Sequence, residues 1–196
     1  MLDPQMKTQL QGYLQRLQRP VEILVSAATG TASQEMRALI GELTTLSPLL
    51  SAVEAEAGAA PVPSFALRRP GEAPRIRFAG VPLGHEFTSL VLALLQTGGH
   101  PPKVEAALLE QIAVLPGELH FETFVSLSCH SCPDVVQALN LMAVVNPRIR
   151  HTMIDGAEFP EEVARRQILG VPAVFLNGQP FNQGRMELAE IIARLD

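Results

Sequence analysis

Apolar and polar residues follow two spacings along the chain, and these spacings alternate. Where large apolar residues recur every three or four positions, the pattern predicts amphipathic helices. These segments are 6–17, 33–46, 85–95, 104–115, 132–145, 160–167 and 186–195. Short apolar runs between Pro, Gly and Ser turns predict buried or half-buried strands. These segments are 21–25, 50–55, 64–68, 75–78, 121–127, 149–154, 173–176 and 179–181. The chain is therefore expected to form an α/β protein.

The order of these predicted elements occurs twice. A shift of one hundred positions pairs five identical residues, namely Glu22 with Glu122, Val25 with Val125, Ser26 with Ser126, Ala38 with Ala138 and Leu39 with Leu139. Later, Val62-Pro63 matches Val171-Pro172, and Gly80-Val81-Pro82-Leu83 matches Gly178-Gln179-Pro180-Phe181. A period this long indicates tandem domains rather than a solenoid. We expect one domain over 1–100 and a second over 101–196.

Composition narrows the class of protein. A chain of 196 residues, 47% apolar, can bury a core without disulfides. Its net charge is −5 and its fifteen Lys and Arg residues are scattered, which argues against nucleic-acid or membrane-surface binding. The start of the chain is polar, and the longest apolar run, 90–95, is too short to span a bilayer. We expect a soluble protein of the reducing cytoplasm.

The two cysteines lie three positions apart, at Cys129 and Cys132. A predicted strand precedes them and a predicted helix begins at Cys132. Free N–H groups and the helix dipole at this end favour an anion, so the pKa of Cys129 should fall below the free-thiol value of about 8.5. Cys132, one turn later, is placed to attack a mixed disulfide. The pattern predicts a redox-active pair with Cys129 as the attacking thiolate.

Two other interpretations of the pair remain open. Half of a zinc site would need two further ligands, for which His120, His130 and His151 are the candidates. A purely structural or inert pair is the other. His130 is expected to face solvent within the motif, while His85, His100, His120 and His151 are expected in loops or on the surface.

Three segments of the sequence resemble one family. They are 126–142, which reads SLSCHSCPDVVQALNLM, 82–95, which reads PLGHEFTSLVLALL, and 170–175, which reads GVPAVF. This combination, spread over the whole chain, is similar to the N-terminal domain of the flavoprotein component of alkyl hydroperoxide reductase, the reductase of the bacterial peroxiredoxin system. The resemblance implies two tandem thioredoxin-like folds, with mixed sheets flanked by helices and only the second fold carrying Cys-x-x-Cys. Thr29 and Ala32 stand at the corresponding places in the first half.

The resemblance also implies roles for individual residues. Cys129 would be the interchange nucleophile and Cys132 the resolving thiol. Glu86 would be a carboxylate that the first fold places near the dithiol, as a candidate proton acceptor. From the residues alone, Glu86 has a simpler interpretation as a carboxylate at the start of a helix, because acidic residues are common in the first helical turn.

Substrate contacts follow from the same resemblance. In the thioredoxin superfamily a loop ending in a cis-proline faces the cysteines and pairs with the substrate backbone, which points to Val171 and Pro172 here. A Pro at this place suits the start of a strand. His130 and Ser131, inside the motif, would also contact substrate. Members of the family carry Asn where Ser131 stands, a change that can alter the redox potential.

The sequence holds no Gly-x-Gly-x-x-Gly after a strand and no second Cys-x-x-Cys, so no cofactor is expected in this chain. The resemblance implies that FAD and NADH bind a C-terminal flavoprotein portion beyond Asp196, which supplies electrons for the disulfide of a peroxiredoxin partner. One alternative is a free-standing glutaredoxin- or thioredoxin-like general disulfide reductase. Another is a binding module whose cysteines only report the redox state.

Overall fold

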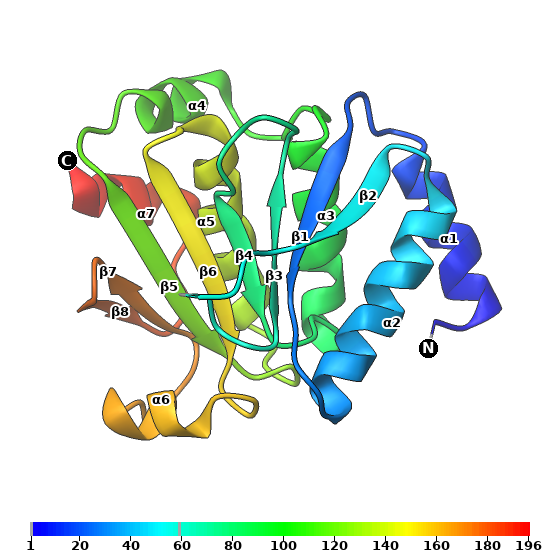
Figure 1. Cartoon of the computed structure of the whole chain (residues 1–196). Helices are drawn as coiled ribbons and strands as arrows, with labels where there is room; N and C mark the ends of the chain where they lie inside the picture. The colour runs from blue at the N-terminus through cyan, green and yellow to red at the C-terminus, as the bar shows by residue number, and fades with distance from the viewer. Residues whose placement is uncertain (1, 59) are drawn as a thin grey trace.

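A computed structural model describes residues 2–58 and 60–196 of the chain. Its strands form one eight-stranded mixed sheet in the order β2-β1-β3-β4-β6-β5-β7-β8 (Figure 1). The strands are β1 (Val21–Ser26), β2 (Leu50–Glu54), β3 (Ser64–Arg68), β4 (Ile76–Ala79), β5 (Leu119–Val125), β6 (Ile149–Asp155), β7 (Ala173–Leu176) and β8 (Gln179–Gln183). The strands predicted from the sequence are confirmed, with ends that differ by at most two residues.

The sheet contains the same arrangement twice. In the first half β1 pairs in parallel with β2 and antiparallel with β3, which pairs antiparallel with β4. In the second half β5, β6, β7 and β8 repeat these pairings in the same order. The parallel pair of β4 and β6 joins the two halves into a continuous sheet. The division of the chain at residues 100 and 101 stays a prediction.

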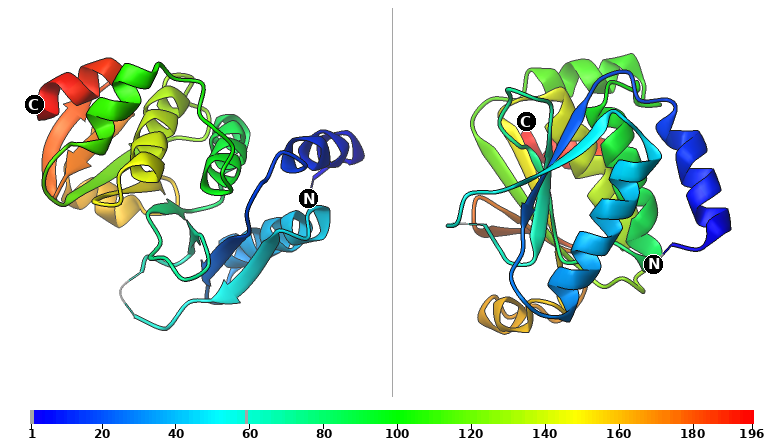
Figure 2. Two further views of the ribbon diagram at one scale, coloured as in Figure 1. Left: turned by 90° about the horizontal axis from the view of Figure 1, so that it is seen from above. Right: turned by 45° about the vertical axis from the view of Figure 1, so that its right-hand side comes forward.

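Helices cover mainly one face of this sheet. They are α1 (Pro4–Leu14), α2 (Thr31–Leu46), the 3-10 turn η1 (Gly84–Glu86), α3 (Phe87–Thr97), α4 (Ala106–Ala113), α5 (Cys132–Val145), α6 (Pro160–Arg165) and α7 (Leu188–Leu195). Helices α3 and α5 contact each other, and α4 and α7 contact α5 on the same side. Figure 2 shows these four helices together, with α6 on the opposite face. The contact between α3 and α5 brings the two halves together a second time.

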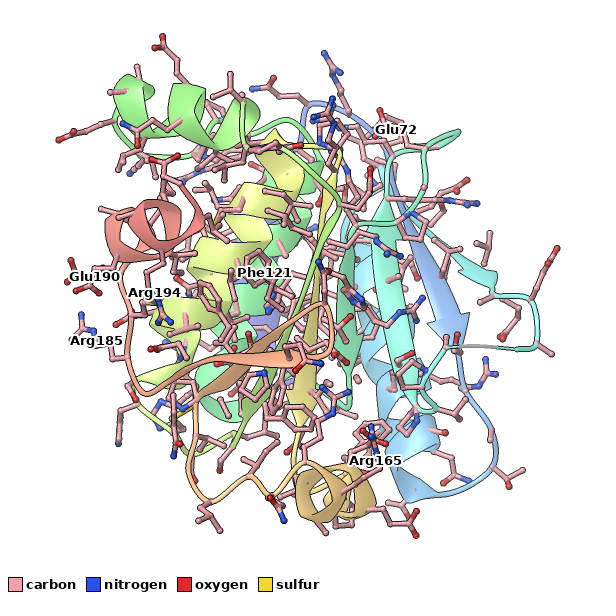
Figure 3. The ribbon with its side chains drawn as sticks, turned by 90° about the vertical axis from the view of Figure 1, so that its left-hand side faces the viewer. Glu72, Phe121, Arg165, Arg185, Glu190 and Arg194 are labelled. Atoms are coloured by element: carbon pink, nitrogen blue, oxygen red, sulfur yellow. A yellow bond between two sulfur atoms is a disulfide. The ribbon has the colours of Figure 1, made fainter. Side chains whose placement is uncertain are left out.

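The main core lies between the sheet and its helical face. Fully buried Phe65, Phe78 and Phe121 come from strands of both halves, so the core is continuous across the junction. A smaller cluster on the other face packs Phe124 and Phe175 against α6. At the far edge of the sheet, the ring of Phe121 meets Phe181 of β8 edge-on at 5.6 Å, and the guanidinium of Arg194 from α7 covers Phe181 at 4.6 Å (Figure 3).

The helices are confirmed with ends that shift by a few residues, and the starts of α2 and α3 differ from the prediction in an informative way. Helix α2 starts at Thr31 rather than Ser33, and Gly30 precedes it without a side-chain cap. The Ser33 hydroxyl instead accepts a hydrogen bond from the Ala28 N–H at 3.1 Å, because it points back across the turn that enters the helix. The segment predicted as a helix from residue 85 begins as a 3-10 turn, and the α-helix follows only from Phe87.

One match of the internal repeat was wrong. The Gly80 N–H donates to the Pro63 carbonyl at 3.0 Å, and the Gly184 N–H donates to the Pro172 carbonyl at 2.8 Å. Gly80 is therefore the structural counterpart of Gly184, at the end of the half's last strand, whereas Gly178 precedes β8. Both prolines follow cis bonds. The match of Val62-Pro63 with Val171-Pro172 agrees with the structure, because both prolines have the same cis bond and accept the same hydrogen bond.

His151 was expected on the surface or in a loop, and this prediction was wrong. It lies on β6 in the centre of the sheet and is only 1% exposed. Its Nε2 is 2.8 Å from the Thr123 hydroxyl, and its Nδ1 is 2.7 Å from the Asn140 side-chain oxygen. Burial lowers the pKa of His151 to about 3, so the ring is neutral and its two nitrogens suit these two partners. His120 is also on a strand, β5, and half-buried rather than in a loop.

Candidate active site

The two cysteines form a disulfide where β5 leads into α5, with Cα atoms 5.6 Å apart. A turn after β5 brings the chain to Cys129, whose N–H donates to the Ser126 carbonyl at 3.0 Å. Helix α5 then begins at Cys132, as predicted. Cys132 is fully buried, whereas Cys129 is partly exposed. An incoming molecule therefore reaches the sulfur of Cys129 before that of Cys132.

The surroundings of Cys129 suit a thiolate. Ser131 stands at the cap position of α5 without capping it through its side chain, which leaves its hydroxyl free for other partners. That hydroxyl lies 3.7 Å from the Cys129 sulfur. The N–H groups of the first turn of α5 face the same end of the helix. Donors of both kinds are able to stabilise a thiolate at this position once the disulfide is opened.

The loop before β7 lies beside this cysteine loop. Ala173 pairs with Phe124, so the residues that precede β7 run alongside the end of β5. Pro172 is buried and follows a cis bond, and Val171 is 37% exposed. Among the described residues, neither the N–H nor the C=O of Val171 makes a backbone hydrogen bond. Leu169 in the same loop is 97% exposed, so this edge offers an unpaired backbone and a free apolar side chain.

The first half reaches the cysteine loop through η1. The His85 N–H donates to the Leu127 carbonyl at 2.9 Å. Gly84, with a φ of +56°, lies so close to Leu127 that a Cβ placed on it would come within 2.7 Å of that carbonyl oxygen. The His85 ring lies 4.3 Å from the His130 ring, centroid to centroid, and both side chains are exposed. His130 thus faces solvent, as expected from the sequence.

Glu86 is the next residue of this turn and is completely buried. Among the described residues, neither of its carboxylate oxygens has a partner with hydrogen-bond geometry. Burial raises the pKa of Glu86 to about 7, and the nearby Ser89 hydroxyl opposes this rise only in part. The Ser89 hydroxyl also accepts a hydrogen bond from Gln137 of α5 at 3.2 Å. A carboxyl that titrates near neutrality is therefore enclosed at the junction of the two halves.

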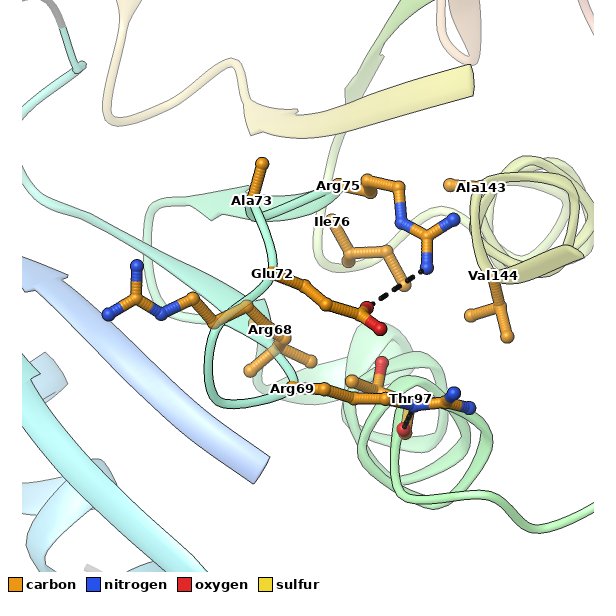
Figure 4. A pocket seen from close by; sticks show the side chains of 10 residues that line it. Arg68, Arg69, Glu72, Ala73, Arg75, Ile76, Thr97, Ala143 and Val144 are labelled. Atoms are coloured by element: carbon orange, nitrogen blue, oxygen red, sulfur yellow. Dashed lines mark hydrogen bonds and ion pairs between the residues drawn. The ribbon is translucent and has the colours of Figure 1, made fainter. Parts of the chain in front are cut away.

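Two of the hollows border α3 and α5 without reaching the cysteines. A small one of about 20 Å³ is closed by the turn between β3 and β4, where Arg69 donates to the Thr97 carbonyl at 2.8 Å and Glu72 pairs with Arg75 at 3.5 Å (Figure 4). It lies at the carboxyl ends of α3 and α5, one helix length from Cys132. A groove of about 790 Å³ runs between α1, α3 and α5. Neither hollow is lined by a cysteine or by Glu86.

Metal-binding clusters and membrane spans are both absent from residues 2–58 and 60–196. Within these ranges, no three His, Cys, Asp or Glu side chains gather in a way that would hold a metal ion. No described helix is both long enough and apolar enough to cross a bilayer.

Comparison with known proteins places this geometry in a class. A family model described as a thioredoxin domain matches residues 119–196. A solved protein disulfide oxidoreductase from Aeropyrum pernix k1 superposes with a TM-score of 0.85 at 22% identity, covering 100% of this chain and 93% of that one, which shows the shared fold. The chain has two tandem thioredoxin-like folds, of which the second carries the disulfide at the start of a helix. The fold and the position of this disulfide define the class of two tandem thioredoxin-like folds with one cysteine pair.

More similar proteins define the family. Alkyl hydroperoxide reductase AhpF of Pseudomonas putida is 55% identical over 196 residues, and that of Escherichia coli (strain K12) is 54% identical. Each match covers 100% of this chain but 38% of the relative. The solved NTD_N/C domain of AhpF from Enterococcus faecalis (V583) has a TM-score of 0.91 and 32% identity, with both chains covered completely. The chain belongs to the family of the N-terminal domain of AhpF.

Sequence reasoning missed two residues at this site. His85 was expected to be a surface or loop residue without a role, yet it contacts the cysteine loop. The signal available was its position between Gly84 and Glu86 in a segment that resembles the family. Leu169 drew no attention, although a large apolar residue directly before Gly170-Val171-Pro172 is unusual in an exposed loop.

Proposed function

We propose that this chain relays electrons by dithiol-disulfide exchange from a flavoprotein portion, which binds FAD and NADH, to the disulfide of a peroxiredoxin. The observation that carries the proposal is a disulfide with one accessible and one buried sulfur, in a chain more than half identical to part of AhpF. The chain spans 38% of that relative, so the flavoprotein portion is expected in the remaining part of the same polypeptide. A cytoplasmic location, where such cofactors are available, belongs to this proposal.

The accessibility of the two sulfurs sets the order in which the two cysteines attack. The Cys129 thiolate attacks one sulfur of the partner disulfide, which forms a mixed disulfide and releases one partner thiolate. Cys132 then attacks the Cys129 sulfur, which closes the Cys129–Cys132 disulfide and releases the second partner thiolate. Two electrons pass to the partner, and the two released thiolates take up the protons that the two cysteines lost. Cys132 is completely buried, so it is unsuited to the first attack.

Glu86 is proposed as the proton acceptor for Cys132. A buried thiol needs a base to become a nucleophile, and water has little access to it. The pKa of Glu86 is raised to about 7 by burial, close to the range in which a base both holds and releases a proton near neutral pH. Glu86 belongs to the first half and directly follows His85, which contacts Leu127 of the cysteine loop. This gives the cysteine-free half a chemical role.

The partner is proposed to lie along the loop before β7. The unpaired backbone of Val171, beside Pro172, can extend the sheet by hydrogen bonding to an extended segment that holds the partner's disulfide. His130 and Ser131 border the exposed side of Cys129 and would contact the same segment. These four residues form the proposed substrate edge.

Stoichiometric transfer tests the proposal. The chain is reduced, freed of reductant and mixed with the oxidised peroxiredoxin of the same organism, and the thiols of both proteins are followed by mass spectrometry. We expect one disulfide to be reduced per chain. Cys132→Ser should accumulate a mixed disulfide through Cys129, and Cys129→Ser should form neither product. Transfer by Cys129→Ser would contradict the mechanism.

A parallel arm tests the general disulfide reductase alternative. Insulin and oxidised glutathione replace the peroxiredoxin under the same conditions. If the chain is a dedicated relay, its rate constant with the peroxiredoxin should exceed those with insulin and glutathione by about tenfold or more, because the surfaces of the chain and the peroxiredoxin are complementary. Equal rate constants for all three substrates would favour the general reductase.

A further inference from the structure

His85 contacts the cysteine loop on both sides of Cys129. Its N–H donates to the carbonyl of Leu127, two residues before Cys129, at 2.9 Å. Its ring packs on the ring of His130, the residue directly after Cys129, with centroids 4.3 Å apart and planes tilted by 58°. The segment that carries the nucleophile is therefore held at both ends by one residue, and that residue belongs to the half without cysteines.

The turn that carries His85 has little freedom to move. Gly84 has a φ of +56°, a conformation that L side chains rarely adopt, and any Cβ there would collide with the Leu127 carbonyl. On the other side, the Glu86 side chain is fully buried, which anchors the turn to the core. The His85 backbone is therefore fixed relative to the cysteine loop.

The two rings are the adjustable part of this contact. The His85 and His130 side chains are both exposed, so solvent alone would leave each of them several rotamers. Packing one ring on the other restricts both, and through His130 it restricts the backbone on the carboxyl side of Cys129. A restricted loop keeps the two sulfurs close together, which favours the closed disulfide over the open dithiol.

We propose that His85 is a positioning residue for the dithiol, which acts through its ring contact with His130 to hold Cys129 near Cys132. The proposal deepens the function proposed above and rests on it only in taking Cys129 and Cys132 as the exchanging pair. Loss of the ring contact should make the disulfide easier to reduce. The expected shift in the equilibrium constant is about threefold, which is about 14 mV for a two-electron couple.

The test is the equilibrium of the chain with glutathione, in which the Cys129–Cys132 disulfide and two glutathione thiols exchange with the dithiol and glutathione disulfide. We compare His85→Ala and His85→Phe with the wild type. The Phe variant keeps an aromatic ring without an ionisable group. We expect the Ala variant to shift about threefold toward the dithiol and the Phe variant to stay at the wild-type value. A Phe variant that behaves like the Ala variant overturns the ring contact as the cause.

Two further variants separate positioning from general damage. His100→Ala is a matched control, since His100 is a half-buried loop histidine outside the site, and it should leave the equilibrium unchanged. His130→Ala should shift the equilibrium as His85→Ala does, and the double variant should shift it no further, because both remove one contact. Additive shifts, or an unchanged equilibrium in His85→Ala, would overturn the proposal.

The glutathione equilibrium is measured without the peroxiredoxin, so its result does not depend on that partner. Circular dichroism and the melting temperature show whether each variant is folded. Transfer to the peroxiredoxin is measured separately, so a wild-type chain that fails to reduce it would refute the relay and leave the glutathione result as the measure of His85.

Discussion

The substitution Glu86→Gln removes a buried carboxyl at the junction whose pKa is raised to about 7. In the unfolded chain this group titrates near its ordinary value of 4.5. Between these two pH values the folded chain binds the proton more tightly, so the stability conferred by the neutral carboxyl is complete below pH 4.5 and is lost as pH rises through 7. Most of this loss occurs between pH 4.5 and 7, because the unfolded chain ionises Glu86 in that range and the folded chain does not.

The magnitude follows from the shift of the pKa. A difference of about 2.5 between the two values corresponds to about 3 kcal/mol of lost stability at pH 8. Glutamine has nearly the same shape and does not ionise, so the variant should escape this loss. We expect Glu86→Gln to gain about 2 to 3 kcal/mol relative to the wild type between pH 5 and pH 8.

Urea unfolding of the oxidised chain at pH 5, 6, 7 and 8 measures the effect. Glu161→Gln is the matched control, since Glu161 stands in the first turn of α6 and is exposed. Its free energy of unfolding should track the wild type at every pH. The difference between Glu86→Gln and the wild type should grow with pH, and a difference that stays constant from pH 5 to pH 8 would refute a raised pKa for Glu86.

Three further predictions concern other parts of the chain. Leu169→Ser should lower the second-order rate constant for transfer to the peroxiredoxin about tenfold with unchanged thermal stability, if this side chain becomes buried on binding, whereas Val114→Ser, at an exposed site after α4, should leave that rate constant unchanged. His151 is neutral when folded, with a pKa of about 3, so its contribution to stability is complete above pH 6.5 and lost as pH falls toward 3; His151→Gln should flatten this part of the acid unfolding curve. Leu139→Ala, at a fully buried position of α5, should lower the free energy of unfolding by about 2 to 5 kcal/mol in urea, and a loss below about 1 kcal/mol would contradict tight packing there.

The local parts of the site were predictable from the sequence. A strand, two cysteines and a helix that begins at Cys132 are neighbours along the chain, and apolar spacing with the motif placed them correctly. The Val171-Pro172 turn was found in the same way, because a proline that enters an apolar run marks the start of a strand. Each of these features is governed by interactions between residues close in sequence.

Features that depend on contacts between residues far apart in the sequence were harder to predict. Burial of His151 requires Thr123 and Asn140 on its two nitrogens, and these partners come from β5 and α5. The contact of His85 with His130 joins residues 45 positions apart, and the parallel pair of β4 and β6 joins the halves. Hydrophobic spacing reports which face of an element is buried, but it does not report which element covers that face.

The roles proposed for His85 and Glu86 would give the fold without cysteines a function at the dithiol of the other fold. The start of helix α5 favours a thiolate at Cys129. Cys132 is fully buried, so water can hardly reach its thiol to remove the proton. The turn Gly84–Glu86 contacts the cysteine loop through His85, and its next residue, Glu86, is completely buried. The two variants of this turn, His85→Ala and Glu86→Gln, should therefore affect different steps. The first should change the equilibrium between disulfide and dithiol, and the second the pH dependence of the step in which Cys132 closes the disulfide.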